Sequence, residues 1–451
     1  MPHSPHLSTH SAIRGDLIAN WWRSYQFRTA IKKGNLRRAE ELLQEIQKSG
    51  ARLSSLEKLF KDKLQLEQTT RDYRQQISAQ YRQLSQLRQQ LEQIEPSQAL
   101  GEIPTDILTP EPEFIEFISK NFKFVEHDEN MLQCTGIDRR VFDDFEESLA
   151  DFIKEEFSQQ SRKKNFHFLL DDAINDINRL KGGQDPQYRF ELSPHIYLMR
   201  YFLDNVYCAY LAWFLIYKSG LLPSKINILD IAAGPGTIAY GLALLLQSSN
   251  SFLSAPPMHV SYYSLEQQKS FQYRGLQFWR KYIEPQERAT NAYFRFDTCS
   301  IFDYDNQSAR MPLNFFNLIV ISHCFFSDSE ARDKSIVVYK DIFTNCLKEN
   351  GHVLLIIQEK KLFKAYGVRQ IGSRNEEESV VKKFVEELGL NLVWYKYLTS
   401  RYRREPITEF GRFARENLPN QKFMSPLLRQ YFKLNFDLNY TLDDYVILAK
   451  K

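Results

Sequence analysis

INILDIAAGPGTIA, residues 226–239, is the stretch that decides the fold of this chain. Its first six residues form a short apolar run typical of a buried strand, and a helix is predicted to follow over residues 238–247. Gly234 and Gly236 lie at the turn between the two. Because glycine has no Cβ, the backbone of such a turn can closely approach a ligand that lies across the carboxyl end of the strand. The stretch therefore predicts a cofactor site on an α/β sheet.

The sequence that follows alternates short apolar runs with longer helical patterns. This alternation is typical of a parallel α/β sheet with helices on both faces. The run at residues 316–322 is apolar almost throughout, as expected for a strand buried on both faces. Six strands are predicted after the first, over residues 258–265, 293–296, 316–322, 352–358, 391–398 and 445–449. We therefore expect a sheet of seven strands.

The turn after the first strand also carries a family resemblance. Asp230, Ala232, Gly234 and Gly236 fall on the four positions of the first motif of class I S-adenosylmethionine-dependent methyltransferases, an acidic residue followed by alternate glycines. Over about residues 195–451 the sequence resembles this superfamily, with Ala232 where the family usually has its first glycine. The resemblance implies a seven-stranded Rossmann-like methyltransferase sheet whose last strand pairs antiparallel with the sixth. It also implies S-adenosylmethionine as the cofactor.

The same turn fits a second class of cofactor. Gly234, Gly236 and Ala239 satisfy the G-x-G-x-x-A fingerprint of dinucleotide-binding folds. A dinucleotide places its pyrophosphate at the helix N-terminus, where the nearby Asp230 carboxylate would repel it. S-adenosylmethionine has no phosphate and carries a positive sulfonium and a positive ammonium, so the same carboxylate is favourable. The sequence thus favours a methyltransferase over an NAD- or FAD-binding protein.

Cofactor-binding residues are predicted at the ends of the first four strands. The resemblance implies that Asp230 faces the ammonium of the cofactor and that Asp297, after the third strand, contacts adenine. Glu266, after the second strand, can accept hydrogen bonds from both ribose hydroxyls, although an ordinary acid at a helix N-terminus could also stand there. No metal ligands are predicted. The predicted cofactor-binding set is Asp230, Ala232, Ala233, Gly234, Pro235, Gly236, Glu266, Gln267, Asp297, Thr298 and Ser322.

His323 directly follows the fourth predicted strand. The resemblance implies that this segment lies beside the methyl group and the acceptor, and imidazole has a pKa range suited to moving a proton there. His323 is therefore the candidate general base, with a purely structural histidine as the equal alternative. The segment contains no N-P-P-Y or D-P-P-Y, so the usual signature for methylating amino groups of adenine or glutamine is absent from it.

Residues 400–441 form a long insertion before the last predicted strand. It is rich in arginine and aromatic residues, including Arg401, Arg412 and Arg415. Such interleaving can bind RNA through phosphate contacts and base stacking. It can equally form a helical lid over the site, and the sequence leaves both interpretations open.

The N-terminal part of the chain is predicted to be all-α. Two helices are expected around the turn at Gly34 and Asn35, and residues 56–94 carry apolar residues at heptad spacing. That pattern predicts either a coiled coil for self-association or partner docking, or a long helix folded back on the first two. The expected domains are residues 1–95, a proline-rich linker at 96–112, an acidic helical region at 113–194 and a methyltransferase-like domain at 195–451.

Composition excludes few partner classes. The net charge is +3, and the five cysteines are scattered without any C-x-x-C pair, which argues against a disulfide framework and a zinc site. The most hydrophobic stretch, residues 201–217, contains Asp204 and Asn205 and is typical of a buried helix rather than a membrane span. We expect a cytoplasmic protein without membrane contact.

Two functions follow from these patterns. The first is methyl transfer from S-adenosylmethionine to an acceptor. RNA, protein and a small metabolite are all open as acceptors, and the N-terminal helices favour RNA or protein. The second is a catalytically inactive methyltransferase-like scaffold that docks a partner through its N-terminal helices. Fold alone does not choose between them.

Overall fold

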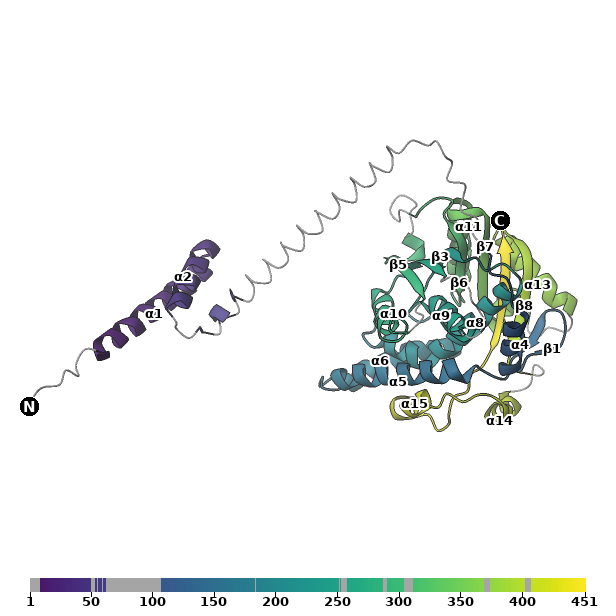
Figure 1. Cartoon of the computed structure of the whole chain (residues 1–451), viewed down its shortest axis with the longest axis horizontal. Helices are drawn as coiled ribbons and strands as arrows, with labels where there is room; N and C mark the ends of the chain where they lie inside the picture. Colours follow the sequence, from purple (N-terminus) through teal and green to yellow (C-terminus); the bar gives the residue numbers. More distant parts are fainter. Residues whose placement is uncertain are drawn as a thin grey trace, which may run out of the picture. The chain divides into compact units, whose positions relative to one another are not determined.

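The computed structural model describes most of the chain in two compact units, Met1–Gly101 and Glu102–Lys451 (Figure 1). The described residues are 9–49, 53–54, 56–58, 60–61, 107–182, 184–250, 252, 258–286, 290–303, 311–368, 374–401 and 407–451. Nearly all of the heptad pattern predicted over residues 56–94 lies outside them, so the coiled coil stays a prediction.

The first unit contains a helical hairpin. Helices α1 (Thr9–Lys32) and α2 (Leu36–Lys48) are joined by a turn in which Gly34 has a φ of +71°. The side chain of Asn35 caps α2 by accepting a hydrogen bond from the Arg38 backbone N–H at 3.1 Å. The apolar faces of the two helices meet in a small core formed by Phe27, Ala30, Ala39, Leu42, Leu43 and Ile46.

The second unit is built on a nine-stranded sheet, two strands more than the seven expected. The strand order is β1-β2-β8-β9-β7-β6-β3-β4-β5. Strand β9 runs antiparallel to both β7 and β8, as the resemblance predicts for the last strand. The strands are β1 (Val125–Glu126), β2 (Met131–Gln133), β3 (Lys225–Ile231), β4 (His259–Leu265), β5 (Asn291–Asp297), β6 (Phe316–Ser322), β7 (Leu347–Gln358), β8 (Asn391–Thr399) and β9 (Asp443–Lys450).

The two additional strands come from the acidic region that was predicted to be helical throughout. Between β1 and β2, the Asp128 carboxylate accepts hydrogen bonds from the backbone N–H groups of Asn130 and Met131 at 2.7 and 2.8 Å. Such local bonds stabilise a turn and compete with helix formation. Strand β2 then pairs in parallel with β8 at the edge of the sheet. The prediction of an all-α region before residue 195 was therefore wrong at residues 125–133.

Helices cover both faces of the sheet (Figure 1). Alternate strand residues point to opposite faces, so Ile228 belongs to one core and Leu229 to the other. The first core lies against α4 to α10 and α15, and the second lies against α11 to α13. The helices are α4 (Pro112–Asn121), α5 (Arg139–Gln160), α6 (Phe166–Ile177), α7 (Ser193–Tyr197), α8 (Leu203–Lys218), α9 (Thr237–Ser249), α10 (Lys269–Tyr282), α11 (Ser329–Cys346), α12 (Glu359–Ala365), α13 (Arg374–Glu387), α14 (Ile407–Asn417) and α15 (Met424–Phe432).

Helix α8 fixes the helix that follows the glycine turn. A Cβ added to Gly241 on α9 would lie 2.7 Å from both the Ala209 Cβ and the Tyr210 backbone nitrogen of α8. The Trp213 indole N–H also donates to the Ile238 carbonyl at 2.9 Å. This close packing sets the position of the α9 N-terminus and of the turn before it.

The insertion at residues 400–441 packs on α5. The buried Glu146 carboxylate of α5 accepts hydrogen bonds from the backbone N–H groups of Phe423 and Met424 and from the Tyr440 hydroxyl. Burial raises the pKa of Glu146, and these three donors oppose the rise. None of the described residues of the insertion lines the large cavity of the site described below.

None of the described helices is both long enough and apolar enough to span a membrane. Helix α8, which covers most of the hydrophobic stretch at residues 201–217, is buried within the second unit. Its apolar side chains contribute to the first core, which explains the hydrophobicity of the stretch.

We predict that Gly241→Ala destabilises the protein by about 1–3 kcal/mol, because the new methyl group overpacks the contact between α8 and α9. The midpoint of urea unfolding, followed by tryptophan fluorescence, measures the effect. Gly411→Ala on α14 is the matched control, since its Cβ meets nothing within 4 Å and should leave stability equal or slightly higher. Equal midpoints for the two variants would contradict the close packing.

Candidate functional site

A cavity of about 890 Å³ opens at the carboxyl ends of the central strands. Its walls include Gly234 after β3, Glu266 after β4, His323 after β6 and Gln358 at the end of β7. The chain passes from β3 to β4 on one side and reaches β6 on the other, so the cavity lies where the strand order reverses. This is the place where open α/β sheets bind ligands.

The turn between β3 and α9 has a backbone that favours glycine. Ala232, Gly234 and Gly236 have φ values of +56°, +55° and +86°. A Cβ added to Gly234, which lines the cavity, would meet no atom within 4 Å. The backbone of the turn therefore faces open space that a side chain would fill.

Glu266 holds this turn in place. One carboxylate oxygen accepts a hydrogen bond from the Gly234 backbone N–H at 2.9 Å, and the other accepts from the Gln268 N–H at 2.8 Å. The residue is buried but lines the cavity, and burial raises its pKa. Each carboxylate oxygen has a second lone pair, so Glu266 can accept further hydrogen bonds from a ligand.

Asp230 lies beneath the turn rather than on the cavity wall. Its side chain is buried, the Tyr262 hydroxyl donates to Oδ2, and Oδ1 has no hydrogen-bond partner. Burial raises the pKa of this carboxyl to about 7, with a further contribution from the nearby Glu266 charge. An unpaired carboxylate oxygen in this environment is favourable for a positively charged ligand.

Some of the other predicted cofactor residues line the cavity, and the rest lie behind its wall. Ala232, Gln267 and Ser322 line the cavity beside Gly234 and Glu266. The remaining predicted residues surround this wall. Pro235 and Gly236 border a separate small crevice, and Ala233 is buried. The Asp297 carbonyl accepts hydrogen bonds from the Glu266 N–H and the Gln272 side chain, and the Thr298 hydroxyl donates to Gln272. The next residues of the same loop, Cys299, Ser300 and Ile301, line the cavity.

His323 is part of a chain of three polar side chains. Its Nδ1 lies 3.0 Å from the Ser322 hydroxyl, and its Nε2 lies 3.1 Å from a carboxylate oxygen of Asp444. The backbone of His323 has a φ of +58°, and its N–H donates to the Ile356 carbonyl at 2.8 Å. The sequence analysis did not predict Asp444, because Asp444 and His323 are 121 positions apart and only the position of β9 beside β7 brings them together.

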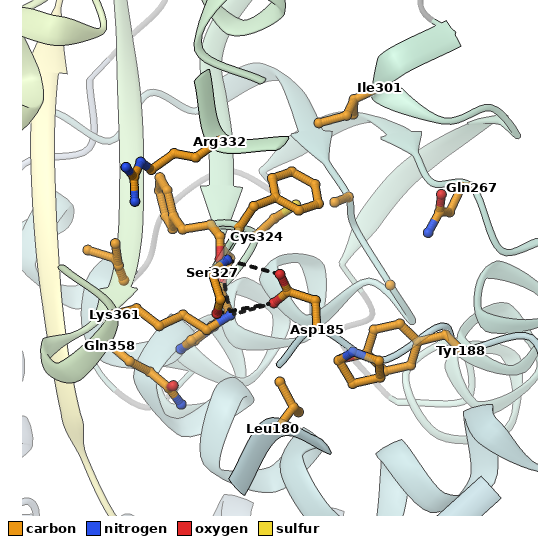
Figure 2. Close-up of a pocket in the computed structure, with 18 of the residues that line it drawn as sticks. Leu180, Asp185, Tyr188, Gln267, Ile301, Cys324, Ser327, Arg332, Gln358 and Lys361 are labelled. Carbon is orange, nitrogen blue, oxygen red and sulfur yellow. Dashed lines mark hydrogen bonds and ion pairs between the residues drawn. The ribbon is translucent and has the colours of Figure 1, made fainter. Parts of the chain in front are cut away.

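A short segment before α7 connects the two sides of the cavity. Asp185 accepts hydrogen bonds from the backbone N–H and the hydroxyl of Ser327 and lies 3.5 Å from the Lys361 ammonium, as the dashed lines in Figure 2 show. Two residues on, Gln187 accepts a hydrogen bond from the Gln268 side chain at 3.4 Å. This segment could not be predicted from the sequence, since its role depends on contacts with the loops after β4 and β6 and with α12.

Seven of the strands lie in the order β5-β4-β3-β6-β7-β9-β8, and β9 runs antiparallel to β8, the sixth predicted strand, as the resemblance predicts for the last strand. An all-parallel dinucleotide-binding sheet would not contain such a strand. The chain has the class I methyltransferase fold. Within the described ranges, no group of three or more His, Cys, Asp or Glu side chains is placed to hold a metal ion.

Comparisons with solved structures give matches at low sequence identity and low TM-score. No protein-family model matches the sequence, and no curated protein matches it. A methyltransferase from Methanosarcina mazei is 14% identical with a TM-score of 0.29, over 51% of this chain and 94% of its own. Magnesium protoporphyrin IX methyltransferase from Synechocystis, with bound S-adenosylmethionine, is 8% identical with a TM-score of 0.29, over 56% of this chain and 85% of its own. A methyltransferase from Corynebacterium glutamicum is 12% identical with a TM-score of 0.28, over 57% and 98%.

We predict that Ala232→Gly stabilises the protein by about 1 kcal/mol, because an alanine in the left-handed region pays a steric penalty that glycine avoids. The urea midpoint measures this change. Ala233→Gly is the matched control: this neighbour does not have a positive φ, so its replacement should lower stability. A loss of stability in both variants would argue against strain at Ala232.

Proposed function

We propose that this protein binds S-adenosylmethionine in the cavity and transfers its methyl group to an acceptor. The observation that carries the proposal is the turn after β3. Gly234 has a positive φ, offers open space where a Cβ would stand, and is held by the Glu266 carboxylate. A cofactor that lies across the strand end needs such an exposed backbone.

The charges around the turn support a cationic cofactor over a dinucleotide. Asp230 and Glu266 place two carboxylates beneath and beside the turn, and Oδ1 of Asp230 has no hydrogen-bond partner. A positive ammonium or sulfonium in the cavity would be attracted through space by both carboxylates, although Asp230 itself does not line the wall. The pyrophosphate of a dinucleotide would instead meet two negative groups near the N-terminus of α9.

Named residues would hold the parts of the cofactor. In our proposal Glu266 accepts hydrogen bonds from the ribose hydroxyls, and Gln267 and the loop at Ile301 contact the adenosine. Asp297 would support Glu266 through its backbone carbonyl, which accepts from the Glu266 N–H at 3.1 Å. Ser322 would lie on the side of the reacting methyl group.

The bound cofactor supplies an electrophilic methyl group, and the chain supplies position and proton transfer. We propose that Ser322 lies next to the acceptor and that His323 takes its proton through Nδ1. Asp444 would orient the ring by accepting from Nε2, which leaves Nδ1, 3.0 Å from the Ser322 hydroxyl, without a proton and able to act as the base. This arrangement supplies the partner that the sequence alone did not reveal for His323.

We predict that the full chain binds S-adenosylhomocysteine with micromolar affinity and that Gly234→Ala weakens binding at least about tenfold, because the methyl group enters the space that the cofactor contacts. Isothermal titration calorimetry measures both. Gly220→Ala is the control: its φ is also positive, at +65°, so it carries the same backbone strain, but Gly220 does not line the cavity. A folded wild-type protein that does not bind the ligand would contradict the proposal.

A second prediction uses the raised pKa of Asp230, which lies at about 7 in the folded protein. Without ligand, the Asp230 carboxyl is protonated below about pH 7. A positively charged group on the ligand favours the ionised carboxylate. The affinity should therefore rise with pH until Asp230 is fully ionised. The ligand is S-adenosylhomocysteine, whose own ionisation changes both affinities equally, so it cancels in the ratio of wild-type to Asp230→Asn affinity. We expect this ratio to grow from near one at pH 5 to about tenfold at pH 8.

Asp204→Asn is the control for that measurement. Asp204 is also buried with a pKa raised to about 7, but its carboxylate accepts hydrogen bonds from Gln421 and Thr441 of the insertion and does not line the cavity. This variant should keep the wild-type dependence of affinity on pH. A flat ratio for Asp230→Asn would show that Asp230 does not interact with the ligand.

A further inference from the structure

One end of the cavity is cationic. Arg332 on α11 and three lysines on α12, Lys360, Lys361 and Lys364, line it. Lys360 and Lys364 are four residues apart and therefore lie on the same face of the helix. In Figure 2, Arg332 and Lys361 lie on one side of the cavity, and Gln267 and Ile301 lie on the other, where we place the cofactor.

In the described ranges, three of these four cations have no carboxylate partner. Lys361 pairs with Asp185 at 3.5 Å and donates to the Phe325 carbonyl at 3.1 Å. In the part of the chain that the structure describes, Arg332, Lys360 and Lys364 form no ion pair. Like charges gathered without partners repel each other, and a bound anion removes that repulsion.

The wall between the cationic end and the end of β6 is aromatic. Phe325 and Phe326 follow Cys324 in the loop after β6, and the Phe326 ring lies 5.1 Å from the Phe302 ring. Aromatic walls bind planar or apolar groups through their faces and edges. A molecule that lies on this wall can place one part next to Ser322, at the end of β6, and another part next to the arginine and lysine side chains.

Contacts of the segment at residues 185–187 restrict the size of the acceptor. Asp185 binds Ser327 and Lys361 on the cationic side, while Gln187 binds Gln268 on the cofactor side. The segment therefore bridges the elements on both sides of the cavity. This bridge favours a small molecule over a polymer that must lie across the opening.

We propose that the methyl acceptor is a small molecule with an anionic group, a carboxylate or a phosphate, that binds to Arg332, Lys360 and Lys364. Its apolar or planar part lies on the wall formed by Phe325 and Phe326 and leads to Ser322. This assignment rests on the proposed function, because it takes the opposite end of the cavity as the cofactor site.

The test is a titration of the full chain saturated with S-adenosylhomocysteine. The probes are benzoate, phenyl phosphate and neutral benzamide, with binding measured by calorimetry. We expect at least one of the two anions to bind and benzamide to bind at least about tenfold more weakly. Arg332→Gln and Lys364→Gln should each weaken anion binding about fivefold or more, without changing the affinity for S-adenosylhomocysteine. Lys340→Gln, an exposed residue on α11 away from the cavity, is the matched control and should bind like wild type.

The outcomes separate this inference from the proposed function. Normal binding of S-adenosylhomocysteine with no preference for the anions, or with no effect of Arg332→Gln and Lys364→Gln, would overturn the anionic acceptor and leave the proposed function intact. Failure of S-adenosylhomocysteine itself to bind would overturn both. A uridine octanucleotide that binds and is weakened by the same variants, while benzoate and phenyl phosphate do not bind, would replace the small acceptor with RNA. A preference between benzoate and phenyl phosphate identifies the anionic group.

Discussion

The candidate site depends on the hydrogen bond between the Gly234 backbone N–H and the Glu266 carboxylate. The turn after β3 contains three residues with positive φ, and such a backbone persists only when its surroundings determine it. Glu266 joins the ends of β3 and β4, and the packing of α8 on α9 through Gly241 fixes the other end of the turn. Together these contacts keep the Gly234 backbone open to the cavity without a side chain in the way.

The central fold and the position of this turn could be predicted from the sequence. A buried strand that leads directly into alternate glycines has few structural solutions, and the apolar runs after it are as regular as parallel strands require. Gly234, Glu266 and Ser322 line one cavity because the carboxyl ends of parallel strands meet at one edge of the sheet. The local sequence is therefore enough to predict which residues at strand ends lie at the site.

What the sequence did not reveal depends on long-range contacts. Asp444 reaches His323 only because β9 lies beside β7, and Asp185 reaches Ser327 from a loop 142 residues earlier. No local sequence pattern indicates which residues so far apart in the chain will be in contact. Strands β1 and β2 were missed for a different reason, since they are only two and three residues long and lie among amphipathic helices. The heptad pattern lies outside the described residues, so its role in self-association or docking stays a prediction.

The most direct test of the account is a crystal structure of the protein with S-adenosylhomocysteine. The account predicts that the ligand lies across the turn at Gly234, with its ribose hydroxyls hydrogen-bonded to Glu266 and its sulfur facing the end of β6. A ligand bound elsewhere, or a Glu266 carboxylate that contacts only the turn while the ribose lies away from it, would contradict the central claim.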